Sequence, residues 1–208
     1  MKTVLSLAEG EKLIKLARQT IELYLKEGRI PELPMDVPPS FLEKKGVFVT
    51  LLSYPSYELR GCIGLPYPQK ELVRAVIDAA LAAAFEDPRF NEVDERELRN
   101  IIIEVSILTE PKKIEVKKPE EYLNKIVIGR DGLIIKAGFY SGLLLPQVPV
   151  EQGWNEEEYL ANLCYKAGLS SSAWQEEDIE IYSFQAQIFS EEKPYGNVIE
   201  KKLKAYEG

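Results

Sequence analysis

One stretch constrains the fold of this chain more than any other, residues 100–108, which read NIIIEVSIL. Nearly continuous Ile and Val with a single carboxylate predict a strand that is covered on both faces and therefore central in its sheet. A central strand needs neighbours, and apolar segments joined by turn residues lie on both sides of it. These segments predict two hairpins, one over residues 46–64 with its turn at Tyr54-Pro55-Ser56 and one over residues 125–138 with its turn at Arg130-Asp131-Gly132.

Helical periodicity accounts for much of the remaining chain. A capping box formed by Ser6 and Glu9 begins an amphipathic helix that ends at Gly28. An alanine-rich helix follows the first hairpin and ends at Asp87-Pro88, and a third helix ends at Gly168 before a long late strand. The predicted helices and the late strand span residues 6–28, 70–86, 155–167 and 179–189. Hairpins with helices between some of them predict an α+β fold, a mainly antiparallel β-sheet flanked by helices.

The chain has no histidine, and this absence excludes several classes of chemistry. Its 208 residues cannot form a Ser-His-Asp or Cys-His nucleophile pair, a His-ligated zinc site or an imidazole acid or base. The two cysteines are about a hundred residues apart, and no calcium-loop or phosphate-loop motif is present. We therefore expect neither a metal nor another cofactor. Any reaction would use cysteine, carboxylate, lysine, tyrosine or arginine side chains.

The charge balance disfavours general nucleic-acid binding. The net charge is −8, and an acidic chain repels a polyphosphate unless its positive charges gather on one surface. Residues 112–136 hold seven basic and four acidic side chains, whereas residues 151–180 hold eight acidic and one basic. We interpret this basic middle segment and acidic late segment as solvated faces. A nucleic-acid site on the basic segment is the alternative.

Cysteine usage and hydropathy indicate a reduced, cytoplasmic protein. No export signal is recognisable, and no run approaches the ~20 apolar residues that a spanning helix needs. We therefore expect no membrane partner. Glutamate far outnumbers aspartate and lysine is abundant, a usage typical of the surface ion-pair networks of thermophilic proteins.

The segment LRGCIG at residues 59–64 contains the main site candidates. Strand alternation puts Arg60, Cys62 and Gly64 on one face and Gly61 on the other. A cation beside a thiol favours the thiolate, and glycines in a strand leave room for a ligand or for another backbone. Cys62 is therefore either a nucleophile or ligand-contacting residue beside Arg60, or a small buried side chain. Gly61 and Gly64 are candidate substrate-binding positions on the first interpretation.

Two further polar residues are candidates. Glu104 interrupts the apolar run of the central strand, and a buried carboxyl group must be paired, hydrogen-bonded or protonated. If Glu104 meets Arg60 across the sheet, the two form either a structural ion pair or the polar floor of a cleft. A raised pKa would let Glu104 act as the catalytic acid or base that histidine supplies elsewhere. Gln147 lies between two prolines in a predicted constrained loop, where its amide could contact a ligand, although loop rigidity alone explains the prolines.

The hexapeptide LRGCIG resembles the hallmark of the AMMECR family, named for the Alport syndrome, midface hypoplasia and elliptocytosis chromosomal region. Four later segments resemble other blocks of that family in the same order: AAAFEDPRF at 82–90, EVSIL at 104–108, LLPQV at 144–148 and CYKAGL at 164–169. Together they span nearly the whole chain. The sequence is identified as a member of the stand-alone prokaryotic or archaeal type.

The resemblance implies more about the fold than about the reaction. It implies a larger portion built from both chain ends and a smaller middle portion. We accordingly expect a single domain over residues 1–208, with a smaller subdomain within about 91–140. It also implies a functional cleft that involves Arg60, Cys62, Glu104 and Gln147, and Memo-type or radical-SAM proteins as companions. The resemblance implies no established reaction.

Two classes of function stay open. One hypothesis is a cleft enzyme that acts on a small or nucleotide-like substrate through Cys62 and Arg60. The other is a non-enzymatic regulatory or binding module for a nucleic acid or a protein partner, in transcription, translation or repair, or an accessory to Memo-type and radical-SAM proteins. The sequence does not decide whether the chain is an enzyme, and a lowered pKa of the Cys62 thiol would favour the first hypothesis.

Overall fold

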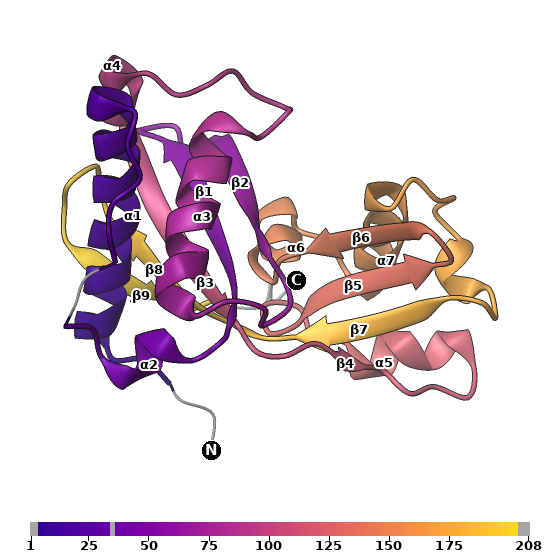
Figure 1. Ribbon diagram of the computed structural model, residues 1–208. Coiled ribbons are helices and arrows are strands. Elements are labelled where there is room, and N and C mark those ends of the chain that lie inside the picture. Colours follow the sequence, from indigo (N-terminus) through magenta and orange to yellow (C-terminus); the bar gives the residue numbers. More distant parts are fainter. Residues whose placement is uncertain (1–3, 34–35, 204–208) are drawn as a thin grey trace. The chain divides into compact units, whose positions relative to one another are not determined.

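The computed structural model describes residues 4–33 and 36–203, and these residues form two compact units. The first unit contains residues 4–110 and 187–201, and the second contains residues 111–186 with 202–203. Each unit combines a β-sheet with helices (Figure 1). The α+β prediction is therefore confirmed, as is a larger portion built from both chain ends.

The first unit is organised around a five-stranded sheet with the order β2-β1-β3-β8-β9. Its strands are β1 (Gly46–Ser53), β2 (Leu59–Leu65), β3 (Ile101–Leu108), β8 (Ala186–Glu191) and β9 (Val198–Lys201). The β1–β2, β1–β3 and β8–β9 pairs are antiparallel. Strand β3 is the middle strand and is buried along its whole length, as its unbroken apolar sequence predicts.

Two long helices cover one face of this sheet, and two short helices complete the helical part of the first unit within its described residues. They are α1 (Leu7–Glu27), α2 (Pro39–Leu42), α3 (Leu72–Phe85) and α4 (Glu95–Leu98). The long helices α1 and α3 pack against each other and against the sheet (Figure 1). The predicted capping box is present, because the Ser6 hydroxyl accepts from the Glu9 amide while the Glu9 carboxylate accepts from the Ser6 amide. Alternate residues of β1, namely Val47, Val49 and Leu51, are fully buried in the core of this unit.

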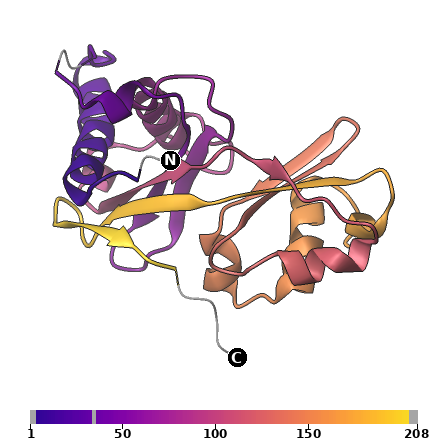
Figure 2. The ribbon, with the colours of Figure 1, turned by 90° about the horizontal axis from the view of Figure 1, so that it is seen from below.

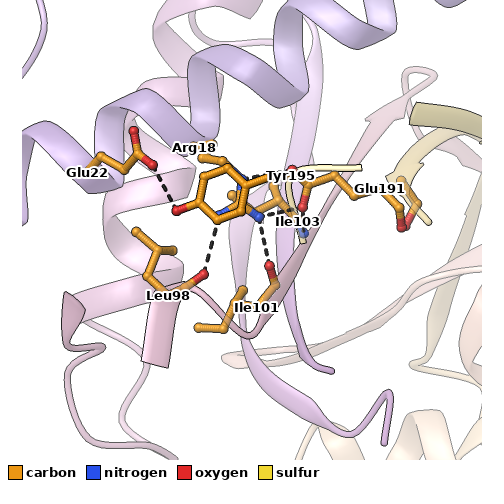
Figure 3. Close-up of polar contacts among 8 residues, drawn as sticks. Arg18, Glu22, Leu98, Ile101, Ile103, Glu191 and Tyr195 are labelled. Atoms are coloured by element: carbon orange, nitrogen blue, oxygen red, sulfur yellow. Dashed lines mark hydrogen bonds and ion pairs between the residues drawn. The ribbon is translucent and has the colours of Figure 1, made fainter. Parts of the chain in front are cut away.

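A buried ion pair fastens α1 to the sheet (Figure 3). The Arg18 guanidinium donates through Nε to the Glu191 carboxylate at 2.8 Å and through Nη1 and Nη2 to the carbonyl oxygens of Leu98 and Ile101. The same carboxylate accepts from the backbone amide of Ile103 at 2.9 Å. Each nitrogen of the guanidinium thus has an acceptor, so this pair meets the condition under which a buried charge is tolerated.

The second unit holds a four-stranded sheet with the order β4-β7-β5-β6, whose pairs are antiparallel. Its elements are β4 (Lys112–Lys113), the 3-10 turn η1 (Pro119–Glu121), α5 (Tyr122–Lys125), β5 (Gly132–Ala137), β6 (Tyr140–Leu144), α6 (Gln147–Gln152), α7 (Glu156–Lys166), the 3-10 turn η2 (Ala173–Gln175) and β7 (Glu180–Phe184). Its helices lie on one side of the sheet (Figure 2). A separate core forms there, with Tyr159, Leu160 and Leu163 of α7 fully buried.

Several boundaries differ from the sequence prediction. Residues 91–110, expected within a smaller subdomain, belong to the first unit because β3 is the centre of its sheet. The second hairpin turns at Gly138 and Phe139, not at residues 130–132 as predicted, and Gly138 supplies the positive φ that the tight turn needs. The single late strand predicted over 179–189 is two strands, because β7 pairs in one sheet and β8 in the other.

Candidate functional site

The hexapeptide LRGCIG forms the edge strand β2, and a β-bulge interrupts its alternation at Arg60. Leu51 of β1 lies opposite Gly61 while Leu52 lies opposite Leu59, so Arg60 is the extra residue. Its side chain points to Glu97, to which Nη2 donates at 2.9 Å and with which Nε is also hydrogen-bonded. Arg60 therefore pairs with Glu97 and not with Glu104, the partner that the sequence left open, because the bulge redirects Arg60 toward α4.

Cys62 and Glu104 instead lie in one row across three strands. Thr50 of β1 is the direct cross-strand neighbour of both residues, so all three side chains share the sheet face opposite α1 and α3. The Thr50 hydroxyl donates to the Cys62 sulfur at 3.3 Å. Glu104, which is buried, accepts from the Lys201 ammonium at 3.2 Å. The structure thus brings two of the predicted site residues together, with a threonine between them.

A carboxylate and a guanidinium cover the edge of β2 at Cys62. The Asp87 carboxylate accepts the Cys62 backbone N–H at 2.9 Å, and Arg89 donates to the Cys62 carbonyl oxygen at 3.3 Å. Arg89 also donates to Asp87 through Nε at 2.9 Å and through Nη2 at 2.6 Å. The hydrogen bonds from Arg89, helped by the Cys62 amide, lower the pKa of Asp87 to about 2. Asp87 and Arg89 therefore take the place of a neighbouring strand at this edge.

The Cys62 thiol is not activated by this surrounding charge. Burial raises its pKa, an effect that the Thr50 hydrogen bond and the Arg89 charge oppose without cancelling. The Glu104 and Asp87 charges act in the same direction as burial. The Arg60 guanidinium, which was expected to favour the thiolate, is engaged by Glu97.

A pocket of about 620 Å³ lies beside the bulge. We call it the Arg60 pocket, and it is lined by Arg60, Pro88, Arg89, Phe90, Asn91, Glu92, Asp94 and Glu97. The loop after α3 and the start of α4 thus supply most of its wall. Asp94 caps α4 by accepting the amides of Arg96 and Glu97, both at 2.8 Å. Two of the lining carboxylates, Asp94 and Glu97, are therefore already hydrogen-bonded within the chain.

The two guanidinium groups of the Arg60 pocket lie over a single aromatic ring. The guanidinium carbons of Arg60 and Arg89 are 5.7 and 5.4 Å from the centroid of Phe90, within the range of cation–π attraction. Arg60 also donates to the Asn91 carbonyl oxygen at 2.9 Å. Its Nη1 atom, although buried, has no hydrogen-bond acceptor among the described residues. The pocket therefore contains a fixed guanidinium with an unused donor.

Comparison with known proteins connects this site to a family. The AMMECR1 family model matches residues 14–189. The chain belongs to the AMMECR1 family. Protein MJ0810 of Methanocaldococcus jannaschii is 55% identical over 200 residues, covering 96% of this chain and 98% of that one. Protein PH0010 of Pyrococcus horikoshii is 54% identical over 197 residues, covering 93% of this chain and 95% of that one.

The fold agrees with that of a solved AMMECR1-family relative. The crystal structure titled as an uncharacterized protein, PH0010 from Pyrococcus horikoshii, superposes with a TM-score of 0.92 at 54% sequence identity. The match covers 94% of this chain and 98% of that one. Both the family resemblance and the α+β fold predicted from the sequence are therefore confirmed.

The glycines of the family hexapeptide serve close backbone packing. A Cβ atom at Gly61 would lie 2.2 Å from the carbonyl oxygen of Ala83 in α3, and one at Gly64 would lie 2.1 Å from that of Val47. Both positions therefore allow a neighbouring backbone to approach, which is one of the two roles expected for them. Gln147 is buried at the start of α6 in the second unit and lies in a helix, not in the predicted loop.

Besides Thr50 and Glu97, sequence reasoning missed the three residues of this AMMECR1-family site in the loop after α3, namely Asp87, Arg89 and Phe90. All three belong to the block AAAFEDPRF, in which Asp87-Pro88 was interpreted only as a helix stop. The available signal was an Asp and an Arg two residues apart directly after a helix. A carboxylate at such a position readily accepts hydrogen bonds from nearby donors. Only the fold places this loop against the edge of β2.

Within 4–33 and 36–203, no group of three or more cysteine or acidic side chains is arranged to hold a metal ion. Over the same residues, no helix combines the length and the apolar character needed to cross a membrane.

Proposed function

We propose that this chain is a cytoplasmic binding protein for a small molecule that carries an oxyanion, a phosphate or carboxylate group, held in the Arg60 pocket. The observation that carries the proposal is the buried Nη1 of Arg60, a charged donor with no acceptor among the described residues, in a side chain that lines a pocket. A buried donor without a partner costs free energy, and a ligand oxygen would remove that cost.

The groups already engaged within the chain explain why the ligand should be an acceptor. Glu97 is paired with Arg60, Asp94 caps α4, and Asp87 holds Arg89. Among the cations of the pocket, Arg60 has an Nη1 atom with no acceptor among the described residues, and the Arg89 side chain is half-exposed. The remaining lining carboxylate, Glu92, is exposed to solvent. Guanidinium groups match the geometry of carboxylate and phosphate oxygens, which supports an oxyanion as the group recognised.

The volume of the pocket and the aromatic ring of Phe90 in its wall favour a ligand larger than a bare ion. A volume of about 620 Å³ lies within the usual range for small-molecule sites. Phe90 adds an apolar surface beside the two cations. A nucleotide-like molecule, with a ring and a phosphate, fits these features and is our choice of probe.

The surroundings of Cys62 support binding over thiol catalysis. A nucleophilic cysteine needs a stabilised thiolate, whereas burial raises the pKa of this thiol. The backbone N–H of Cys62, which could otherwise stabilise a developing oxyanion, donates to Asp87. Cys62 therefore contributes to the site through its backbone, by anchoring the Asp87–Arg89 pair.

Calorimetric titration with adenosine monophosphate, inorganic phosphate, citrate and neutral adenosine tests the proposal. We expect the anions to bind at millimolar concentration or below and adenosine to bind far more weakly. Comparison of phosphate with citrate distinguishes the two oxyanion classes. Arg60→Lys should weaken binding about tenfold, because lysine keeps the charge and loses the planar fork.

The matched control is Arg29→Lys, a change at an exposed arginine that pairs with Glu27 at the end of α1. It should leave anion binding unchanged. Equal binding of adenosine and adenosine monophosphate, equal effects of the two arginine variants, or no binding by any anion of the panel would each refute the proposal.

A further inference from the structure

Three tyrosines gather at one end of the five-stranded sheet. Tyr54 and Tyr57 lie in the turn between β1 and β2, and Tyr195 lies in the turn between β8 and β9. The Tyr54 and Tyr57 rings meet edge to face with centroids 6.1 Å apart. The Tyr57 hydroxyl donates to the carbonyl oxygen of Glu192, which joins the two turns. We call these three residues the tyrosine patch.

All three rings of the tyrosine patch are open to solvent. The exposed fractions of Tyr54, Tyr57 and Tyr195 are 39%, 56% and 55%. Tyrosine is enriched at protein interfaces because it offers a large contact area, a polar tip and few torsions to immobilise. Three exposed tyrosines from two joined turns therefore form a contact surface.

The backbone at two of these tyrosines is unfavourable for a large side chain. Tyr57 and Tyr195 have φ values of 59° and 58°, and no other non-glycine residue in the described part of the chain has a positive φ. Such a conformation is an outlier for a bulky residue and is energetically unfavourable. Glycine would occupy both positions without this cost.

The two tyrosines differ in what offsets this cost. The Tyr195 ring lies 4.1 Å from the Arg18 guanidinium carbon, and its hydroxyl donates to Glu22 at 2.9 Å (Figure 3). These contacts stabilise the fold and account for Tyr195. Tyr57 gains the long hydroxyl contact to Glu192 and an edge contact with Tyr54, both at the exposed surface. The fold itself therefore gives less reason for a tyrosine at position 57.

The charges around the tyrosine patch are mainly negative. Glu22, Glu58 and Glu192 lie on the patch or next to it. Two cations oppose these three carboxylates: Lys193 in the same turn, and the exposed Arg99 beside Asn100, whose carbonyl oxygen accepts the Tyr54 backbone N–H. The nearby Arg18 is buried and paired with Glu191, so it presents little charge outward. Carboxylates beside tyrosine rings complement a cation, which a ring face attracts and a carboxylate pairs with.

We propose that the tyrosine patch is a docking surface for a basic, arginine- or lysine-bearing segment of a partner protein. The side chains of that segment pack on Tyr54 and Tyr57 and pair with Glu58 and Glu192. This surface is built from the two turns, and none of its three tyrosines lines the neighbouring Arg60 pocket, so the inference does not depend on the ligand proposed there.

Fluorescence anisotropy with a labelled arginine-rich peptide tests the proposal, with a peptide of the same length in which every arginine is glutamine as the comparator. We expect the arginine peptide to bind, the glutamine peptide to bind at least tenfold more weakly, and added salt to weaken binding. Tyr57→Gly should reduce affinity about tenfold by removing the ring. Because glycine relieves the unfavourable φ, this variant should keep its fold, which circular dichroism checks.

The matched control is Tyr165→Ala, which removes an equally exposed tyrosine from helix α7 of the second unit. It should bind the arginine peptide as the parent does. Equal affinities of Tyr57→Gly and the parent, equal affinities of the two peptides, or no binding would overturn the proposal. Salt-sensitive self-association that Tyr57→Gly abolishes would also overturn it, because the occupant would then be a second copy of this chain.

Discussion

The first unit contains two arginine–glutamate pairs with the same kinds of contact. They differ in whether every guanidinium nitrogen has a hydrogen-bond acceptor. In each, a guanidinium pairs with a glutamate, donates to backbone carbonyl oxygens and lies over an aromatic ring. Around Arg18 every guanidinium nitrogen has an acceptor, and the Glu191 side chain is 4% exposed. At Arg60 the Nη1 atom has no acceptor among the described residues, and the Glu97 side chain is 36% exposed.

The difference shows how residues of one type acquire different roles. A closed network offers nothing to a ligand, and its main effect is to hold α1, β3 and β8 together. A network with an unused donor beside a pocket loses some stability and can recover it on binding. Completeness of hydrogen bonding, more than the presence of arginine, therefore separates the structural cluster from the candidate site.

The largest effect is expected from breaking the closed network. Arg18→Met leaves the Glu191 carboxylate buried without its cation and removes donors from the carbonyl oxygens of Leu98 and Ile101. The loss of one partner of a buried ion pair costs about 3–5 kcal/mol. Urea unfolding followed by circular dichroism should show a decrease of this size in the free energy of unfolding.

The double variant Arg18→Met/Glu191→Leu is the control for this effect. It removes both charges, so it should recover much of the stability that the single variant loses. A single variant that unfolds at the parent's urea concentration would contradict the assignment of a structural role to Arg18.

An intermediate effect is expected at Asp87, and it depends on pH. Hydrogen bonds from Arg89 lower the pKa of Asp87 from 3.8 to about 2, a difference worth about 2 kcal/mol. Because the folded-state pKa is the lower one, this stability is fully present above about pH 4 and is lost as the pH falls toward 2. The free energy of unfolding of Asp87→Asn should therefore fall less steeply than the parent's over that window.

Other acids also have lowered pKa values, including Glu9, which the Ser40 hydroxyl stabilises. The difference between the parent and Asp87→Asn isolates the contribution of Asp87. Parallel pH profiles of the two proteins would show that the Asp87–Arg89 pair contributes no stability. The pair would then not rank between the Arg18 and Arg60 clusters.

A smaller effect on stability is expected at Arg60. Arg60→Met removes an ion pair whose carboxylate is already one-third exposed, so water can solvate Glu97 once the cation is gone. The expected cost is about 1 kcal/mol, well below that of Arg18→Met. Thermal unfolding of the two variants side by side measures the contrast, and equal losses would mean that the Arg60 cluster is as structural as the Arg18 cluster.

Much of the fold of the first unit could be predicted from local patterns. The apolar run of β3, the hairpin of β1 and β2 and the capping box of α1 each follow from short-range spacing and all three are confirmed. The division of the late strand at Gln185 could not be predicted. Its apolar residues suit a strand throughout, and only long-range pairing assigns β7 and β8 to different sheets.

The candidate site was only partly predictable, because its geometry depends on one extra residue. Alternation places Arg60 and Cys62 together, but the bulge sends Arg60 to Glu97. A glycine such as Gly61 inside a strand is compatible with a bulge and equally with close backbone packing, so the sequence does not specify the extra residue. The role of Asp87 and Arg89 depends on a contact between a loop and a strand edge about 25 residues away in sequence. Such contacts follow from the assembled fold and not from spacing along the chain.

The smallest effect is expected on the pKa of Cys62, whose thiol accepts a hydrogen bond from the neutral Thr50 hydroxyl. In a Cys164→Ala background, the rate of alkylation should rise with pH to a midpoint above the ordinary value of 9.0, because burial raises the pKa of this thiol. Arg89 opposes the shift, so Arg89→Met should move the midpoint further upward, whereas Arg60→Met should leave it in place. A midpoint below 9.0 in the parent would indicate a stabilised thiolate and would favour thiol catalysis over ligand binding alone.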